Sequence, residues 1–384
     1  MGPVLTLNAG SSSLKFSVFD GAAEMLRGQV SGIGGHASAE ARADGRQLAP
    51  PAPAGATHEA VLPGLLDWIG GQLGGRAIAA AGHRVVHGGT GFVDPVRITD
   101  AVMQDLQALV PLAPLHQPHN LSAIRAVRRA MPDLPQVAAF DTAFHSNMPA
   151  VATWLALPRA LREAGLRRYG FHGLSYEFIA GRLRELSPAV AAGRVLVCHL
   201  GSGASLCAMV DGRSVETTMG FTALDGLVMG TRCGALDPGA VLFLMRERGM
   251  APDAIEDVLY HQSGLLGVSG VSGDMRDLAA GSGPAAQEAV AVFMHRLVSC
   301  AGSMIACMGG VDGIVFTAGI GEHDADVRRA ACQALSWLGL FLDDAANAAG
   351  GTGRISGQGS RVEAWVVPTD EEAVIARHTL AALG

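Results

Sequence analysis

Charged side chains are scarce in this chain of 384 residues. Asp, Glu, Lys and Arg together make up 16% of the sequence, whereas apolar residues make up 49%. The net charge is −7 at pH 7, and the paired arginines never extend into a basic run. Surfaces that bind nucleic acid need such a run or stripe of positive charge. The composition therefore excludes a nucleic-acid-binding protein and predicts a compact chain with a large core.

Cysteine is also rare, and its six copies are scattered without any C-x-x-C spacing. Several lie in apolar stretches such as "VLVCHL", which favours buried, reduced thiols over disulfides or a zinc site. The N-terminus has no basic segment followed by a long apolar run, and no uninterrupted run of about 18 apolar residues occurs elsewhere. We therefore expect a cytoplasmic protein with no secretory signal and no contact with a membrane.

Lysine occurs once, as Lys15, and every other basic residue is an arginine. It lies in "VLTLNAGSSSLKFSVFD" (residues 4–20), where two alternating apolar runs flank a small polar segment at 8–13. This pattern predicts a β-hairpin. Two interpretations of the lysine stay open: a leftover surface residue, or a cation that binds one phosphate oxygen beside a loop rich in hydroxyls. The chain contains no G-x-x-x-x-G-K-[ST], which excludes a Walker A loop.

The length exceeds the size at which a single core stops growing, so two domains are expected. Residues 31–57 are rich in Ala, Gly and Pro, which predicts a peripheral excursion or loop. Apolar residues at helical spacing predict one helix after Thr57, a second over about residues 119–131 and a long apolar one over about residues 285–308.

Residues 195–212, "VLVCHLGSGASLCAMVDG", repeat the pattern of the opening stretch: an apolar strand, a small polar hinge, a second strand and Asp-Gly. With one constant offset, Gly10 matches Gly201 and Asp20 matches Asp211. A further strand with a glycine loop follows at 311–322. The repetition predicts a duplicated α/β protein that binds its ligands in a cleft between the halves, where strand ends and loops converge.

Five clusters in glycine-flanked loops or at predicted strand ends carry candidate functional residues. They are Arg84 in "GHRVVHGG", Asp141 in "FDTAFH", His172 in "RRYGFHG", Arg232 in "GLVMGTRCG" and Glu371 in "VVPTDEEA". Each has a common structural explanation, such as an arginine that caps a carbonyl or acids at a helix start. Together, cations, a histidine, carboxylates and glycine loops are the set of groups that phosphoryl transfer needs.

These blocks resemble those of the acetate/propionate/butyrate kinase family, which belongs to the actin-like ATPase superfamily. The match covers nearly the whole chain, through blocks that include "LNAGSSSLKF", "LAPLHQPHN", "CHLGSGASL", "SGDMRDL" and "TAGIGEH". The resemblance implies an α/β chain with a duplicated actin-like (RNase H-like) two-domain fold and an interdomain active-site cleft. It implies an N-terminal domain over 1–147, a nucleotide-binding domain over 148–368, and a last helix at 369–384 that packs back on the first domain.

The resemblance also implies a role for each matching residue. Four would act in catalysis, with Arg84 also pairing with the substrate carboxylate: Asp141, Arg84, His172 and Arg232. Two would position Mg²⁺, or Mn²⁺ in its place, partly through water: Asn8 and Glu371. The nucleotide, ATP or ADP, would be held by Lys15 with Ser11 and Ser13, and by His199, Leu200, Gly201, Ser202, Gly203, Asp274, Met275, Arg276, Gly319, Ile320, Gly321, Glu322 and His323. A small apolar pocket for the substrate methyl would be lined by Val86, Leu115 and Phe171.

Three matching positions differ from the residue that is usual in the family. Ser202 stands where "HLGNG" has asparagine, His323 where "GIGEN" has asparagine, and Asp370 where "PTNEE" has asparagine. All three lie at the nucleotide or metal end of the expected site. The positions implied for catalysis and for the acyl group match without exception.

The activity that the resemblance implies is reversible, direct in-line transfer of the ATP γ-phosphoryl group to acetate, in a homodimer. One alternative is a propionate or butyrate kinase, with the same chemistry and a larger acyl pocket. The other is an actin-like ATPase that uses nucleotide only to change shape. Arg84, His172 and Arg232 argue against the second alternative, because a conformational ATPase needs no clamp for a carboxylate.

Overall fold

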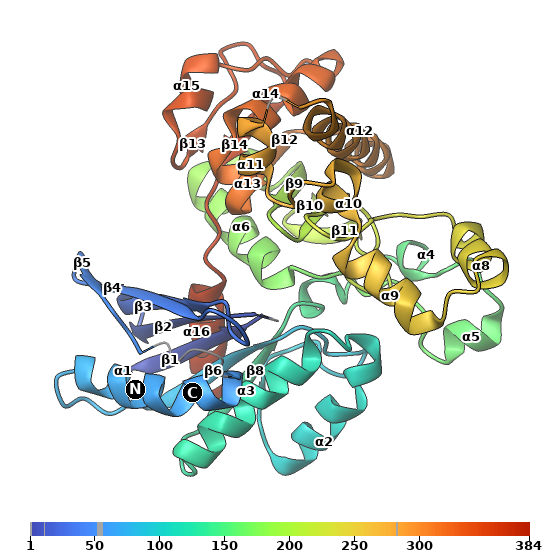
Figure 1. The fold of residues 1–384 in the computed structure, drawn as a ribbon. Coiled ribbons are helices and arrows are strands. Elements are labelled where there is room, and N and C mark those ends of the chain that lie inside the picture. Colours follow the sequence, from blue (N-terminus) through green and yellow to red (C-terminus); the bar gives the residue numbers. More distant parts are fainter. Residues whose placement is uncertain (1, 11, 52–56, 282) are drawn as a thin grey trace. The chain divides into compact units, whose positions relative to one another are not determined.

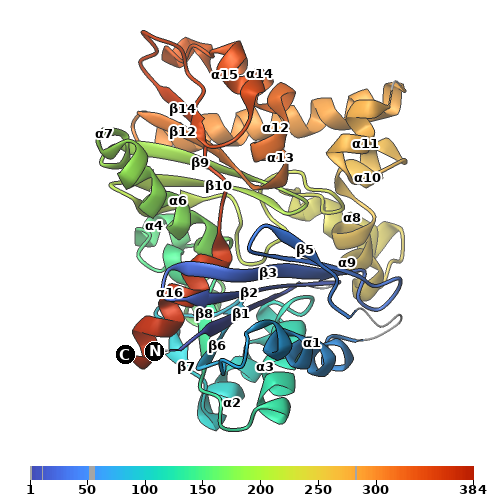
Figure 2. The same ribbon diagram turned by 90° about the vertical axis from the view of Figure 1, so that its left-hand side faces the viewer.

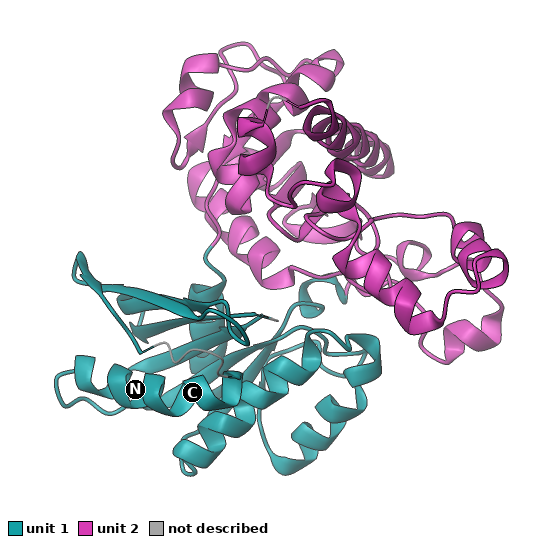
Figure 3. Ribbon diagram, viewed as in Figure 1, with its two compact units in different colours: residues 1–146, 370–384 teal, residues 147–369 magenta. Residues whose placement is uncertain are grey.

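The structure, a computed structural model, describes residues 2–10, 12–51, 57–281 and 283–384. It divides into two compact units, each built around one mixed sheet with helices (Figure 1) (Figure 2). The first unit comprises residues 1–146 and 370–384, and the second comprises residues 147–369 (Figure 3). The sequence predicts domains at 1–147 and 148–368. That the second of these binds the nucleotide stays a prediction.

The sheet of the first unit has the strand order β5-β4-β3-β2-β1-β6-β8-β7. β1 is antiparallel to β2 and parallel to β6, and β6 is parallel to β8. The strands are β1 (Val4–Ala9), β2 (Ser13–Asp20), β3 (Ala23–Ser31), β4 (Ser38–Ala43), β5 (Arg46–Leu48), β6 (Ala80–Val85), β7 (Val96–Arg97) and β8 (Gln136–Phe140). The helical elements are α1 (His58–Gln72), α2 (Asp100–Ala108), η1 (Val110–Leu112), α3 (Gln117–Ala130), η2 (Ala143–His145) and α16 (Glu371–Leu383).

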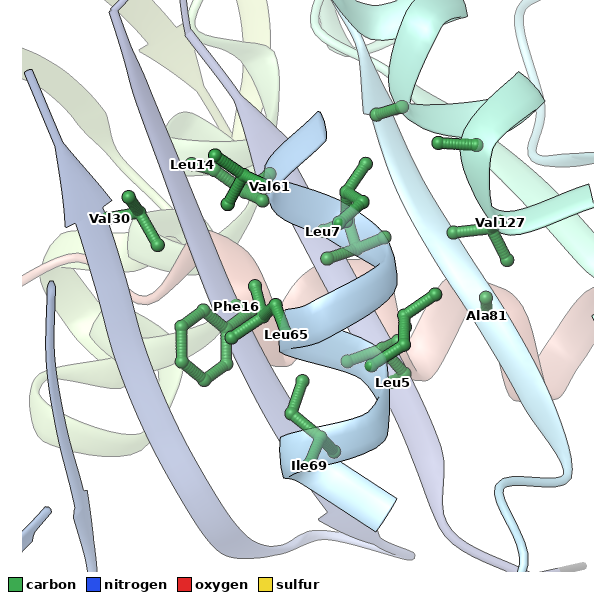
Figure 4. Packing of buried hydrophobic residues seen from close by; sticks show 14 of the residues in the cluster. Leu5, Leu7, Leu14, Phe16, Val30, Val61, Leu65, Ile69, Ala81 and Val127 are labelled. Carbon is green, nitrogen blue, oxygen red and sulfur yellow. The ribbon is translucent and has the colours of Figure 1, made fainter. Parts of the chain in front are cut away.

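The core of the first unit lies between this sheet and helices α1 and α3. Leu5 of β1 and Phe16 of β2 pack with Leu65 of α1 and Val127 of α3 (Figure 4). Ala81 of β6 belongs to the same core (Figure 4). Successive side chains of a strand point to opposite faces of the sheet, so the neighbours of these core residues face away from α1. That second set includes Gly82, against which α16 packs: a Cβ at this position would come 2.1 Å from the Thr379 hydroxyl.

The sheet of the second unit has the order β11-β10-β9-β12-β14-β13. Its strands are β9 (Arg194–Leu200), β10 (Ala204–Val210), β11 (Arg213–Thr217), β12 (Gly313–Thr317), β13 (Gly353–Arg354) and β14 (Glu363–Val366). Its helical elements are α4 (Ala150–Thr153), α5 (Arg159–Glu163), α6 (Gly173–Leu186), α7 (Pro188–Ala191), α8 (Pro238–Glu247), α9 (Pro252–His261), α10 (Gly264–Ser269), α11 (Met275–Ala280), α12 (Pro284–Cys307), α13 (Ala318–His323), α14 (Ala325–Ala334), η3 (Ser336–Leu338) and α15 (Asp344–Ala349).

The two sheets share one arrangement of their central strands. In each, an antiparallel three-strand ribbon (β3-β2-β1 or β11-β10-β9) continues into two further strands that run parallel to its last member (β6-β8 or β12-β14). The stretch from residue 4 and the stretch from residue 195 open the two sheets as matching hairpins. The predicted duplication is therefore confirmed.

Local sequence signals found most elements but failed over residues 31–57. The helix predicted after Thr57 is α1, and the Thr57 side chain accepts a hydrogen bond from the Ala60 N–H. The described part of 31–57 is a peripheral excursion, as one of the two alternatives predicted, but it is not a loop, because β4 and β5 extend the sheet there as a hairpin. Its turn is Asp44-Gly45, both at positive φ, which is a strong hairpin signal that the Ala/Gly/Pro-rich composition obscured. Residues 52–56 lie outside the described part.

Helix α12 is the long apolar helix that the sequence predicts. Among the described residues it is also the one helix long and apolar enough to cross a membrane, although core helices of soluble proteins pass the same test. The sequence predicts this helix but gives no membrane span there, because Glu288, His295 and Arg296 interrupt the run of apolar residues. In the structure α12 packs against α10, α11, α14 and the β9–β11 strands. We therefore read it as a helix of the folded second unit.

Candidate active site

Three adjacent parallel strands of the first unit end in polar side chains that contact one another. Asn8 lies near the end of β1, Arg84 near the end of β6, and Asp141 directly after β8. The carboxyl ends of neighbouring parallel strands meet at one edge of a sheet, which is where α/β proteins bind ligands. The predicted residues Asn8, Arg84 and Asp141 are thus brought together by the topology.

Arg84 and Asp141 form a buried ion pair. The Arg84 Nε lies 3.0 Å from both Asp141 carboxylate oxygens, and Nη2 lies 2.5 Å from Oδ2. The Asp141 side chain is 0% exposed and that of Arg84 is 16% exposed. Burial lowers the pKa of the Arg84 guanidinium, but the charges of Asp141 and Glu371 raise it more, and the net shift is upward. Arg84 is therefore a permanent cation, oriented by Asp141.

The N-terminus of α16 brings two acids to the same strand ends. The Asn8 amide donates to Glu371 Oε2 (2.9 Å) and to Glu372 Oε1 (3.2 Å), and its own oxygen accepts from Arg84 Nη1 (3.0 Å). Burial raises the pKa of Glu372, while the Lys15 charge opposes that shift. The helix starts here because Asp370 caps it, accepting from the Ala373 N–H. Asp370, Glu371 and Glu372 therefore stand at the N-terminus of α16.

Lys15 lies directly across the β1–β2 hairpin from Asn8 and is exposed. Its position at this acidic strand end suits a cation that balances neighbouring carboxylates or a bound anion. The backbone oxygen of Ser13 accepts from the Gly10 N–H (2.8 Å), which closes the turn. Ser11 lies outside the described residues. A phosphate contact by Lys15 or Ser13 stays a prediction.

The donor set at this strand end fits a hard divalent cation. Mg²⁺ prefers oxygen ligands, keeps several waters and is usually held by one or two carboxylates. Glu371 and Glu372 supply carboxylate oxygens, and the Asn8 oxygen, which accepts from Arg84, would reach an ion through water. The part of the chain that the structure describes has no cluster of three or more His, Cys, Asp or Glu side chains able to hold a metal. The two carboxylates and the amide oxygen named above are the oxygen donors that would hold such an ion.

The residues predicted for the acyl pocket are placed within their own units. Val86 follows β6 and is 3% exposed, and Leu115 is half-buried shortly before α3. Phe171 is buried in the second unit. That the three line one pocket stays a prediction. Sequence reasoning did not single out Asn120, whose oxygen accepts from the Val86 N–H (3.0 Å) and whose amide donates to the Ala9 carbonyl (2.8 Å).

In the second unit the predicted nucleotide segments converge on the β9–β10 turn. The Ser202 carbonyl accepts from the Gly230 N–H at 3.1 Å. A Cβ on Gly230 would lie 3.0 Å from the Gly273 carbonyl, and one on Gly201 would lie 3.6 Å from Ala318 Cβ. The segments 199–203, 273–276 and 318–323 are thereby brought together, and glycine allows their backbones to approach.

His172 and Arg232 face the same glycine turn. A Cβ on Gly203 would lie 3.5 Å from His172 Nε2 and 3.8 Å from Arg232 Nη1. The His172 ring stacks on His199 (4.1 Å between centroids), and its Nδ1 lies 2.9 Å from the Ser205 hydroxyl. His172 also adopts φ +59°, a conformation that is uncommon for a residue with a side chain. An imidazole nitrogen and a guanidinium are therefore held next to one backbone position.

Several of the other predicted residues have contacts within their own segments. Asp274 caps α11 and pairs with exposed Arg276 (2.6 Å), Met275 is buried, and His323 Nδ1 lies 3.1 Å from the Gly319 carbonyl. The hydroxyls of Ser175 and Ser205, which orient His199 and His172, were missed by sequence reasoning. The alternating pattern of "GSGASL" placed residue 205 in a strand without indicating which side chain it contacts.

Comparison with known proteins decides the family. A sequence model of the Acetokinase family matches residues 3–377. The chain belongs to the acetokinase family. Acetate kinase of Rhodopseudomonas palustris is 52% identical to it, over 98% of this chain and 97% of that protein. Acetate kinase of Methylocella silvestris is 48% identical, over 99% of this chain and 98% of that protein.

Solved structures of acetokinase-family proteins have the same fold. A propionate kinase from Francisella tularensis has a TM-score of 0.92 at 35% identity, covering 99% of this chain and 100% of that one. Acetate kinase from Porphyromonas gingivalis has a TM-score of 0.89 at 34% identity and covers 100% of both chains. The predicted fold class, a duplicated two-domain α/β chain of the actin-like type, is confirmed.

Proposed function

We propose that this chain transfers the γ-phosphoryl group of ATP to acetate, reversibly and in line, giving acetyl phosphate and ADP. Membership of the acetokinase family makes it an ATP-dependent phosphotransferase whose acceptor is a carboxyl group. One observation carries the proposal: three glycine-rich segments converge on a turn that His172 and Arg232 also face. A phosphoryl group in transfer needs hydrogen-bond donors and positive charge around its oxygens. Backbone N–H groups of the glycine segments, together with an arginine and a histidine, can supply both.

In this proposal Arg232 and His172 stabilise the phosphoryl group in the transition state of its transfer. The transition state spreads negative charge over three equatorial oxygens, and the protein contributes mainly position and electrostatic stabilisation. Ser205 holds the His172 ring through Nδ1, which leaves Nε2 directed at the Gly203 side. The segments at 199–203, 274–276 and 319–323 hold the nucleotide.

The strand ends of the first unit receive the acyl substrate and the metal. Arg84 pairs with the substrate carboxylate, and Asp141 holds the guanidinium in place for it. Glu371, with Asn8 through water, holds Mg²⁺, and Mn²⁺ suits the same oxygen donors. When bound, the ion neutralises charge on the nucleotide phosphates, as does Lys15.

A hydroxylamine trap tests the reaction. Acyl phosphate formed from ATP and acetate is converted by hydroxylamine to a hydroxamate that is measured by colour. We expect ATP-dependent and acetate-dependent hydroxamate. Loss of ATP without hydroxamate from acetate, propionate or butyrate would reject the proposal and indicate the conformational ATPase.

Propionate kinase activity is the second candidate, favoured by the high similarity of the fold to the Francisella propionate kinase. If Val86 closes the acyl pocket, Val86→Ala should improve use of propionate relative to acetate. One methylene in an apolar pocket changes kcat/KM by about 10- to 200-fold at most. The kcat/KM ratio for the two acids is the measurement. An unchanged ratio would remove Val86 from the pocket.

We further propose that the protein is a cytoplasmic homodimer. Support comes from apolar side chains exposed on α8 and α12 of the second unit, Leu242, Phe243, Met245 and Val292. Exposed apolar surface of this kind commonly marks an association face. Light scattering coupled to size exclusion should give twice the chain mass, and a Phe243→Glu variant should shift it toward the mass of one chain.

A further inference from the structure

Glu322 belongs to the glycine-rich segment expected to bind nucleotide, yet its carboxylate bonds the backbone of the protein itself. The Oε1 oxygen accepts from the Ala318 N–H at 2.8 Å and from the Thr369 N–H at 3.2 Å. The Thr317 hydroxyl lies 3.5 Å from the same oxygen. Donors from two segments far apart in the sequence therefore share one acceptor.

The first of these donors fixes the start of α13. Ala318 is the first residue of that helix, where the backbone N–H has no partner inside the helix. It adopts φ +64°, in the left-handed region that disfavours residues with a side chain. Its Cβ lies next to Gly201 of the β9–β10 turn. The Glu322 carboxylate thus satisfies the N–H of a strained residue that borders the turn.

The second donor lies at the start of the C-terminal segment. Thr369 is the last residue of the second unit, and Asp370, which follows it, caps α16 in the first. Glu371 and Glu372 then begin the helix and bind Asn8. The residue from which the chain departs toward these acids is therefore held by an oxygen that also holds α13.

We propose that Glu322 is a positioning residue that couples the α13 segment to Thr369, the last residue of the second unit. By accepting backbone hydrogen bonds, its one carboxylate positions both the α13 segment, expected to bind nucleotide, and Thr369, which precedes Asp370 and Glu371 in the chain. An ionised oxygen is suited to this because hydrogen bonds to a charged acceptor are stronger than neutral ones. The proposal rests on the proposed function only for the identity of the nucleotide.

Amide hydrogen exchange, read by mass spectrometry on the full chain, tests the coupling directly. Glu322→Ala should speed exchange at both Ala318 and Thr369, and it should weaken binding of ADP without metal by about tenfold, as expected for lost hydrogen bonds to a charged group. Glu322→Gln keeps an oxygen acceptor in place, so it should retain most of the protection and bind ADP within about threefold of the original chain. Calorimetry provides the ADP affinity.

The matched control is Asp324→Ala. Asp324 lies two residues from Glu322 and caps the neighbouring helix through the N–H groups of Asp326 and Val327. Its removal should speed exchange at the start of α14 and leave Ala318, Thr369 and ADP affinity unchanged. If Glu322→Ala fails to fold, Glu322→Asp, which withdraws the carboxylate by one methylene, replaces it in the comparison.

Two results would overturn the proposal. Faster exchange confined to Ala318 would show that Thr369 is held by other contacts. Loss of ADP binding in Glu322→Gln with exchange unchanged at both amides would show that the charge of Glu322 contacts the nucleotide directly. Absence of acyl hydroxamate in the original chain would reject the acetate kinase proposal, and the exchange data would still report on Glu322.

Discussion

The two units have the same order of central strands, but the ends of those strands carry different chemistry. In the first unit the strand ends hold charges that are already paired, Arg84 with Asp141 and Asn8 with two glutamates. In the second they hold glycine turns, stacked imidazoles and hydroxyls. Duplication therefore repeated the scaffold without repeating the site. In the proposed function, the first unit holds the carboxylate and the metal, and the second contacts the phosphates.

The difference also concerns stability. Asp141 is completely buried, so its charge depends on Arg84 in the folded first unit. Arg232 in the second unit contacts the Ala223 carbonyl (3.1 Å) and the Met229 sulfur. Both of these partners are uncharged, so removing the Arg232 side chain would leave no unpaired charge at either of them. We therefore expect the two arginines to respond differently to substitution.

The largest effect on turnover is expected at Arg232. Arg232→Ala should lower kcat by about 10³-fold or more, as for other arginines that stabilise phosphoryl transfer, with a modest change in ATP affinity. Steady-state hydroxamate assays give kcat, and calorimetry with ATP in the absence of acetate gives the ATP affinity. Unfolding by urea should be nearly unchanged. Turnover close to that of the original chain would remove Arg232 from the site.

The largest effect on stability is expected at Arg84. Arg84→Met leaves the buried Asp141 carboxylate without its main partner, which should cost about 3–5 kcal/mol of unfolding free energy, in addition to activity. The double variant Arg84→Met/Asp141→Asn removes both charges and should recover part of the stability but none of the activity. Urea titration measures both. Equal stability of Arg84→Met and the original chain would show that the pair is not buried as described.

A smaller effect, and one that depends on pH, is expected at His83. This residue of β6 is buried, its Nε2 donates a hydrogen bond to the side-chain oxygen of Gln136 (2.8 Å), and burial lowers its pKa to about 4. The unfolded chain therefore binds the proton more tightly, so stability is lost as the pH falls from about 6.5 toward 4. The shift corresponds to about 3 kcal/mol.

The variant His83→Met should flatten that decline. Urea titrations at pH 7, 6, 5 and 4.5 compare the slopes of the unfolding free energy, with His261→Met, an exposed histidine of the second unit, as the control. A decline as steep as in the original chain would show that His83 is not the neutral buried histidine described here.

The smallest effect is expected at Asp370, where asparagine is usual in the family. Asp370→Asn keeps an oxygen to cap α16 and loses the ion pair with Arg27 (2.6 Å), whose side chains are 27% and 26% exposed. A pair of this exposure contributes about 1 kcal/mol or less. The midpoint temperature of thermal unfolding should fall slightly, and the Mg²⁺ concentration for half-maximal activity should change little. A large change in that concentration would place Asp370 at the metal.

Sequence reasoning succeeded where the signal is local. Alternation over residues 4–20 predicts the first hairpin, and spacing with a cap at Thr57 predicts α1. Apolar runs placed Arg84 and Asp141 at strand ends, and the family resemblance supplied the roles expected of them. Resemblance gives positions, however, and says little about which atoms contact one another.

What could not be predicted depends on contacts between distant segments. Nothing near Asn120 indicates that its amide joins β1 to the end of β6, because its partners lie more than 30 residues away. Nothing in "TAGIGEH" indicates that Glu322 holds the Thr369 N–H, 47 residues along the chain. The β4–β5 hairpin was missed for a different reason: composition outweighed the Asp44-Gly45 turn.

Docking of α16 against Gly82 has a consequence for the order in which the molecule is made. Synthesis proceeds from the N-terminus, and domains tend to fold as units while the chain emerges. The second unit is one continuous segment, so it can fold as soon as residue 369 is available. The first unit, although synthesised earlier, must wait with the Gly82 face of its sheet uncovered until α16 arrives. The half made first is therefore completed last.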